Sequence, residues 1–221
     1  MQSNFTTTEE NYIKAIYHLQ QPSGSVTTNE LSASLHTKPA SVTDMLKKLK
    51  AKKLLHYEPY KVFQLSTEGK KVALTIIRRH RLWEYFLVEK LGFGWDEVHE
   101  VAEELEHVGS KKLIDKLDAY LNFPKFDPHG DPIPDSNGKM STIQQVCLTE
   151  LQLNKPAQVV SVGSQSSELL DLLSHKQISI GTKLEVKKKF VFDASVEVKV
   201  KNLAPVNISE QLAKVIFVKM L

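Results

Sequence analysis

The stretch that decides the fold is residues 27–65, which read TTNELSASLHTKPASVTDMLKKLKAKKLLHYEPYKVFQL. Thr27 or Thr28 can cap a short helix over residues 30–35, because a threonine hydroxyl accepts a hydrogen bond from a free N–H group of the first turn. A second helix begins near Pro39, since proline suits the first helical position. Its apolar side chains recur at helical spacing, at Val42, Met45, Leu46 and Leu49.

Two short alternating segments follow this helix and predict a β-hairpin. They are residues 54–58 and 62–65, separated by the polar tip Pro59-Tyr60-Lys61. A further helix precedes the stretch, because apolar residues repeat at helical spacing from Thr8 until Pro22-Ser23-Gly24 ends the pattern. Helix, helix, turn, helix and hairpin within about sixty residues is the order of a winged helix-turn-helix domain.

The rest of the chain is predicted to be helical first and β later. Residues 123–139 are rich in proline and glycine and indicate a linker. Several short strands close to the end, with a helical turn at 169–173 between the first two, suit a small SH3-like barrel. The expected helices cover 67–90, 96–108, 110–121 and 142–148, and the expected strands 159–162, 184–186, 196–200 and 215–218.

The fold class is therefore mainly α with β, in three parts. We expect a winged helix-turn-helix domain over 1–66, a helical domain with the proline-rich linker over 67–145, and the SH3-like domain over 155–221. Apolar content of 41% and charged content of 25% are ordinary for globular chains. A single cysteine excludes an internal disulfide, and no apolar run approaches the ~18 residues of a membrane span. We expect a cytoplasmic protein that does not bind membranes.

The predicted second helix of the winged domain has the features of a DNA-recognition helix. Its first turn carries small polar side chains that can reach base edges, while lysines beside it can bind phosphate. Taken alone, the lysines equally suit a solvated helix end that complements the helix dipole. The order of the elements favours DNA binding. The candidate contact residues are Lys38, Pro39, Ala40, Ser41, Thr43, Asp44, Lys47, Lys48 and Lys61.

Imidazole and carboxylate groups share faces of the two helices that follow the winged domain. At about 100° per residue, His99, Glu103, Glu106 and His107 fall within one arc of roughly 100°. Such oxygen and nitrogen donors suit Mn²⁺, Fe²⁺, Zn²⁺ or Co²⁺. A solvated acidic face is the alternative for either helix alone, but His80 and Glu84 repeat the pairing one turn apart. The other histidines, at 18, 36, 56, 129 and 175, are left without a role, and most are expected to be ordinary surface or cap residues.

With these motifs the chain resembles the diphtheria-toxin-repressor family of iron- and manganese-dependent regulators. The resemblance covers essentially the whole chain, including an SH3-like, FeoA-like C-terminal domain. The stretches that carry it are Thr7 to Tyr17, Ser41-Val42-Thr43, Arg79-His80-Arg81-Leu82 with Glu84, Val98 to Val108, and Asp131-Pro132-Ile133-Pro134.

The resemblance implies two metal sites. One would use His80, Glu84 and His99, completed from the SH3-like domain by Gln165 and Glu168. The other would use Glu103, Glu106 and His107 with Asn11. Glu103 stands where iron-sensing members have cysteine, which favours Mn²⁺ over Fe²⁺. Two departures affect the second site: Asn11 replaces a methionine or aspartate, and Lys14 replaces a glutamate of the manganese branch.

The sequence thus predicts a dimeric repressor of metal-homeostasis genes, with Mn²⁺ or alternatively Fe²⁺ as its cofactor. Metal would fix the N-terminal helix and set the spacing of two recognition helices on double-stranded operator DNA. One alternative is a winged-helix regulator that responds to a non-metal ligand. A His/Glu metalloenzyme is another, although the sequence offers no nucleophile and no His-Glu-x-x-His motif. A metal buffer or peptide-binding adaptor is a third.

Overall fold

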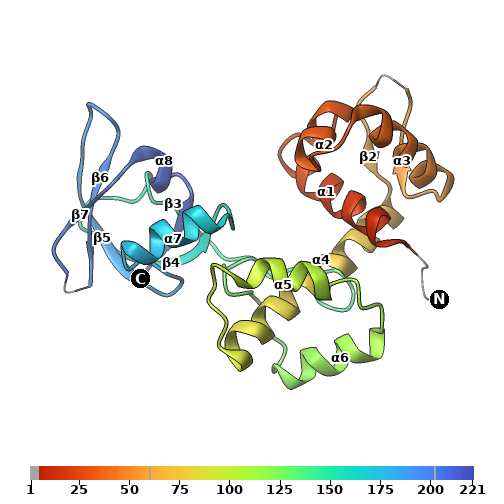
Figure 1. Ribbon diagram of the computed structural model, residues 1–221. Coiled ribbons are helices and arrows are strands. Elements are labelled where there is room, and N and C mark those ends of the chain that lie inside the picture. Colours follow the sequence, from red (N-terminus) through yellow and green to blue (C-terminus); the bar gives the residue numbers. More distant parts are fainter. Residues whose placement is uncertain (1–4, 60, 202) are drawn as a thin grey trace. The chain divides into compact units, whose positions relative to one another are not determined.

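The computed structural model describes residues 5–59, 61–201 and 203–221 (Figure 1). The chain divides into two compact units. The first contains the chain up to His80 together with 103–119 and 134–139, and the second contains 81–102, 120–133 and 140–221. Tyr60, at the tip of the expected hairpin, lies outside the described residues. Among those described, no helix combines the length and apolarity needed to cross a bilayer.

The first unit begins with three helices and a two-stranded hairpin, in the predicted order. Thr6 and Thr27 each form a capping box with the glutamate three residues later, so both helix starts are fixed locally. The hairpin pairs Leu55 with Leu65 in antiparallel register. These elements are α1 (Thr7–Ser23), α2 (Thr28–Ser34), α3 (Pro39–Ala51), β1 (Leu55–His56) and β2 (Gln64–Leu65).

Apolar side chains from all of these elements form one core. Ile13 and Ile16 of α1, Leu46 of α3 and Phe63 of the hairpin are each at most 1% exposed. Burial of such side chains is the main force holding α3 in place. The opposite, polar face of α3 is left toward solvent.

Three further helices follow the hairpin: α4 (Thr67–Leu91), α5 (Val98–Leu105) and α6 (Lys111–Tyr120). The helix predicted over 96–108 is shorter than expected at both ends. Asp96 lies in a turn before α5, and Glu106 and His107 lie in the turn directly after it. The side chains of Glu106 and His107 are therefore placed by this turn rather than by regular helical geometry.

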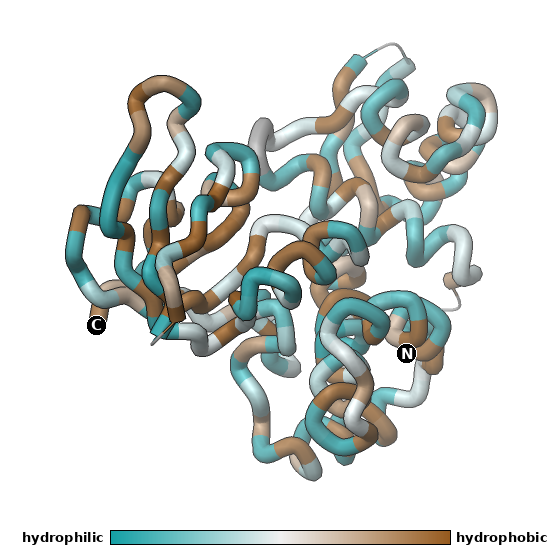
Figure 2. The backbone as a smooth tube through the Cα atoms, turned by 60° about the vertical axis from the view of Figure 1, so that its left-hand side comes forward, coloured by the Kyte–Doolittle hydropathy of each residue, from teal (hydrophilic) through white to brown (hydrophobic). Residues whose placement is uncertain are grey.

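The second unit is built around a six-stranded antiparallel sheet in the order β3-β8-β4-β5-β6-β7. The register shifts between Val159 and Ser161 and between Val186 and Lys188, as it does where a β-bulge bends a strand. Polar and apolar segments alternate along these strands (Figure 2). The elements are β3 (Val146–Cys147), β4 (Pro156–Val162), α7 (Ser167–His175), β5 (Lys183–Lys189), β6 (Val196–Val200), β7 (Val206–Ile208), α8 (Glu210–Ala213) and β8 (Ile216–Met220).

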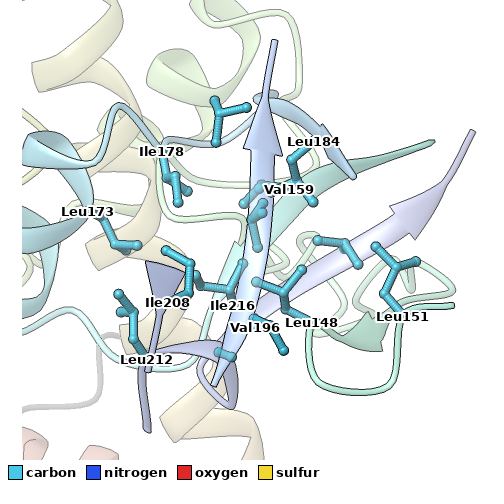
Figure 3. Close-up of a cluster of buried hydrophobic side chains, with 14 of the residues drawn as sticks. Leu148, Leu151, Val159, Leu173, Ile178, Leu184, Val196, Ile208, Leu212 and Ile216 are labelled. Carbon is cyan, nitrogen blue, oxygen red and sulfur yellow. The ribbon is translucent and has the colours of Figure 1, made fainter. Parts of the chain in front are cut away.

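The inward side chains of the sheet pack with α7 and α8 (Figure 3). Val159, Leu173, Ile208 and Ile216 are all fully buried in this core. The short helix predicted over 142–148 is wrong, because β3 pairs with β8 there and this tertiary contact overrides local preference. The strand β7 and helix α8 were not predicted.

Candidate metal centre

Residues 123–133, the part of the proline-rich segment that belongs to the second unit, form a folded loop rather than a loose linker. One carboxylate oxygen of Asp127 accepts hydrogen bonds from the backbone N–H groups of His129 (2.8 Å) and Asp131 (3.0 Å). Gly130 has a φ of 87°, and a Cβ there would lie 1.9 Å from the carbonyl oxygen of Val160. Only glycine fits this position. The loop thereby holds Asp127 and His129 in a defined conformation.

Three metal-ligand groups of the second unit meet at this loop. Glu84 of α4 joins Asp127 and His129, and one ligand atom from each lies within 4.8 Å of the others. We call these three residues the loop cluster. All three side chains are fully buried. His99 of α5 contacts the cluster, with its Nδ1 atom 3.2 Å from Oε1 of Glu84.

The hydrogen bonds around the loop cluster leave ligand atoms available for a cation. Nε2 of His129 lies 2.7 Å from the carbonyl oxygen of Trp95, which can only accept, so Nε2 carries a proton. In the neutral ring Nδ1 then keeps its lone pair, 3.8 Å from Oε2 of Glu84. Nδ1 of His129 and Oδ2 of Asp127 are both buried without a hydrogen bond. This donor set fits a divalent metal ion.

The charges around the loop cluster also favour a bound cation. Burial, Glu84 and Asp131 raise the pKa of Asp127 to about 7, although Arg81 opposes them. Burial disfavours a charged His129 ring, but the neighbouring Glu84 and Asp127 carboxylates outweigh this and raise its pKa. Nε of Arg81 is 3.4 Å from Asp127, and the same guanidinium reaches Asp131 at 3.3 Å. Arg81 therefore pairs with two of the three carboxylates of this region, Glu84 being the third, and a divalent cation would offset the excess negative charge.

The first unit contains a second cluster, formed by Lys14, His80, Glu103 and Glu106, which we call the helix cluster. Nζ of Lys14 lies 2.6 Å from Oε1 of Glu103 and 2.7 Å from both carboxylate oxygens of Glu106. Nδ1 of His80 is 2.7 Å from Oε2 of Glu106. Burial disfavours the charge of Glu106, but His80 and Lys14 lower its pKa overall. This cluster already contains a cationic group.

A neighbouring pair of contacts also joins α1 to the rest of the first unit. Glu10 accepts a hydrogen bond from Arg79 of α4 at 2.8 Å, and its other oxygen is 2.6 Å from Nδ1 of His107. Asn11 follows Glu10, and its amide oxygen is buried without a hydrogen bond. The amide oxygen of Asn11 is thus an available ligand atom in this region.

The predicted metal ligands fall into groups. His80, Glu103 and Glu106 come together in the first unit, and Glu84 and His99 in the second. Nε2 of Gln165 donates to Asp131 at 3.0 Å, beside the loop cluster. Glu168 is exposed on α7 and belongs to neither group of possible metal ligands found among the described residues.

Sequence reasoning missed Asp127 and His129. The sequence leaves His129 without a role, and it is the exception among the five unassigned histidines because its side chain is fully buried. The other four unassigned histidines are exposed, as expected. The available signal was a carboxylate and an imidazole two residues apart, ahead of the Pro-Ile-Pro segment.

The predicted DNA-contact residues lie on the solvent side of α3 and the hairpin. Val42, Leu46 and Leu49 are buried on the other side. The Thr43 hydroxyl bonds the carbonyl of Pro39 at 3.0 Å and the residue is half-buried. The exposed members are Lys38, Pro39, Ala40, Ser41, Asp44, Lys47, Lys48 and Lys61, of which Lys47 pairs with Asp44 and Lys61 with Glu58.

Family models match three successive parts of the chain. Residues 4–63 match the iron dependent repressor N-terminal DNA binding domain, 66–135 its metal binding and dimerisation domain, and 146–220 the FeoA domain. The regulator MntR of Oceanobacillus iheyensis is 34% identical over 122 residues, which is 55% of this chain and 82% of that protein. The chain belongs to the iron-dependent repressor family. It is accordingly a metal-dependent DNA-binding repressor and not an enzyme.

Other comparisons agree with this placement. The iron-dependent repressor IdeR of Mycobacterium leprae is 29% identical over 165 residues, with 72% of each chain covered. A solved manganese-dependent transcriptional repressor in complex with manganese superposes with a TM-score of 0.85 at 31% identity. The match covers 96% of this chain and 100% of that one. The predicted succession of winged helix-turn-helix, helical and SH3-like parts is therefore confirmed.

Proposed function

We propose that this repressor senses Mn²⁺, with Fe²⁺ as the alternative, through the loop cluster of Glu84, Asp127 and His129. The observation that carries the proposal is the set of three buried ligand groups within 4.8 Å, with excess negative charge around them. Carboxylate and imidazole donors without a thiolate suit Mn²⁺. One similar solved repressor is described as a complex with manganese, which supports the same choice.

His99 and Gln165 are proposed as supporting residues of this metal site. His99 contacts Glu84 through Nδ1 and would hold this carboxylate beside a bound cation. Gln165 acts through Asp131 and Arg81, which hold the loop carboxylates. The assignment of Glu103, Glu106, His107 and Asn11 to a further metal site stays a prediction, and so does a role for Glu168.

The proposed output is operator binding by a homodimer in the cytoplasm. The domain matched by residues 66–135 is described as a metal binding and dimerisation domain, which supports a two-fold-symmetric complex. Each α3 would enter a major groove of double-stranded DNA, with Ser41 and Thr43 near base edges and lysines on phosphates. Control of metal-homeostasis genes follows from a repressor whose DNA affinity depends on metal.

The test is fluorescence anisotropy with a labelled palindromic duplex selected in vitro on the Mn²⁺-loaded protein. Coupling of about 1–3 kcal/mol predicts that Mn²⁺ tightens binding about 5- to 150-fold relative to chelator. Glu84→Gln should abolish this difference, because it removes one negative charge from the loop cluster. Glu89→Gln is the matched control, since Glu89 is exposed on the same helix.

Each outcome decides a different part of the proposal. Equal affinity of the wild type in Mn²⁺ and in chelator would favour a non-metal ligand. A full response in Glu84→Gln, with loss of the response in His80→Ala or Glu106→Ala, would move the sensing site to the helix cluster.

A further inference from the structure

Lys14 places its ammonium group where the carboxylates of the helix cluster converge. We propose that this ammonium is the resident cation of the cluster, so that α1 is anchored without a metal ion. The proposal goes beyond the metal-sensing function, because it concerns what holds α1 and not what the loop cluster binds.

The contacts of Lys14 are those of a fully engaged cation. An ammonium has three donors, and Nζ lies within 2.7 Å of one oxygen of Glu103 and both oxygens of Glu106. The side chain of Lys14 is 14% exposed and that of Glu106 is fully buried. Water therefore screens this pair weakly, unlike the exposed pair of Lys71 with Glu68 on α4.

Charge balance distinguishes the helix cluster from the loop cluster. Lys14 faces Glu103 and Glu106, while Arg79 faces Glu10, so two fixed cations oppose three carboxylates. Nδ1 of His107 also lies 2.6 Å from Glu10, and Nδ1 of His80 lies 2.7 Å from Glu106. Around the loop cluster, by contrast, Arg81 pairs with Asp127 and Asp131, and Glu84 adds a third carboxylate.

A divalent ion and the Lys14 ammonium cannot share the same carboxylate oxygens without strong repulsion. Asn11, one turn earlier on α1, contributes a neutral amide oxygen and adds no negative charge that would favour a second ion. The residues of the helix cluster therefore do not fit a metal as well as those of the loop cluster do.

The anchoring contacts join α1 to both neighbouring helices of the first unit. Lys14 donates hydrogen bonds to Glu103 at the end of α5 and to Glu106 in the turn after it. Glu10 is hydrogen-bonded to Arg79 of α4 and to His107. Because none of these contacts needs a metal, α1 should remain docked in the metal-free repressor. The N-terminal helix is then a fixed part of the DNA-binding unit.

Two measurements on the full-length chain test the proposal without DNA. Hydrogen exchange of the amides of α1 is followed in chelator, and bound Mn²⁺ is counted by native mass spectrometry. We expect protected α1 amides and one Mn²⁺ per chain in the wild type. Lys14→Met should speed exchange in α1 at least tenfold, Lys71→Met should not, and Lys14→Glu should admit a second ion.

The proposal is overturned if α1 exchanges freely in the wild type until Mn²⁺ is added. It is equally overturned if the wild type binds two ions and Asn11→Ala loses one of them. Both results come from the wild type or from a mild variant, so they stand even if a Lys14 variant fails to fold. Loss of the single ion in Glu84→Gln tests metal binding at the loop cluster and leaves the role of Lys14 unaffected. The metal-sensing proposal and the Lys14 proposal can therefore fail separately.

Discussion

Manganese binding to the loop cluster should strengthen at least about tenfold between about pH 6 and pH 8. Burial, Glu84 and Asp131 raise the pKa of Asp127 to about 7, so below that pH the carboxyl carries a proton. A metal must displace this proton before it can use the oxygen. The apparent affinity is therefore low on the acid side and rises as the pH passes the pKa of Asp127.

The magnitude follows from the fraction of ionised carboxyl. With a pKa of about 7, roughly one tenth of the chains have ionised Asp127 at pH 6 and roughly nine tenths at pH 8. The ratio corresponds to about 1.4 kcal/mol of binding free energy. The pKa of His129 is also raised, and loss of its proton frees Nδ1, so this ring makes the dependence steeper in the same direction.

Isothermal titration calorimetry in buffers of different ionisation enthalpy measures both affinity and the number of protons released. At about pH 6 we expect one proton or more per Mn²⁺, and at about pH 8 only a small fraction of one. Trp95, whose ring stacks on His129 at 6.1 Å, gives an independent fluorescence signal. Asp127→Asn should bind more weakly and with a flatter pH profile. Equal affinity at both pH values without proton release would refute the reasoning.

Three further changes have defined outcomes. Gly130→Ala should lower the free energy of unfolding by about 2–4 kcal/mol in denaturant titrations and weaken Mn²⁺ binding, because the new methyl meets the Val160 carbonyl. Gly24→Ala, with similar φ but open space, should cost only about 1–2 kcal/mol. Gln165→Ala removes one hydrogen bond and should reduce calorimetric Mn²⁺ affinity by about 0.5–1.5 kcal/mol. Lys48→Ala should weaken binding to all duplexes alike. The slope of log affinity against log salt concentration, measured by anisotropy, should fall by about one.

The sequence by itself determined the features that depend on neighbouring residues. The capping threonines, Pro39 and the apolar spacing of α3 define the recognition helix locally, and alternation marks the hairpin and four strands of the sheet. Helical spacing also grouped His80 with Glu84 and His99 with Glu103. These properties need no knowledge of the tertiary fold, because a cap or an amphipathic face is set within one or two turns.

Only the tertiary structure decided which of the charged groups meet. Asp127 and His129 lie in a segment whose composition indicates a linker, and they become a buried site because the loop folds beside β4 and α4. Lys14 has no special pattern in the sequence, yet its ammonium ends between two glutamates about ninety positions away along the chain. Burial and long-range contact set the charge balance of each cluster, and no local sequence pattern encodes them.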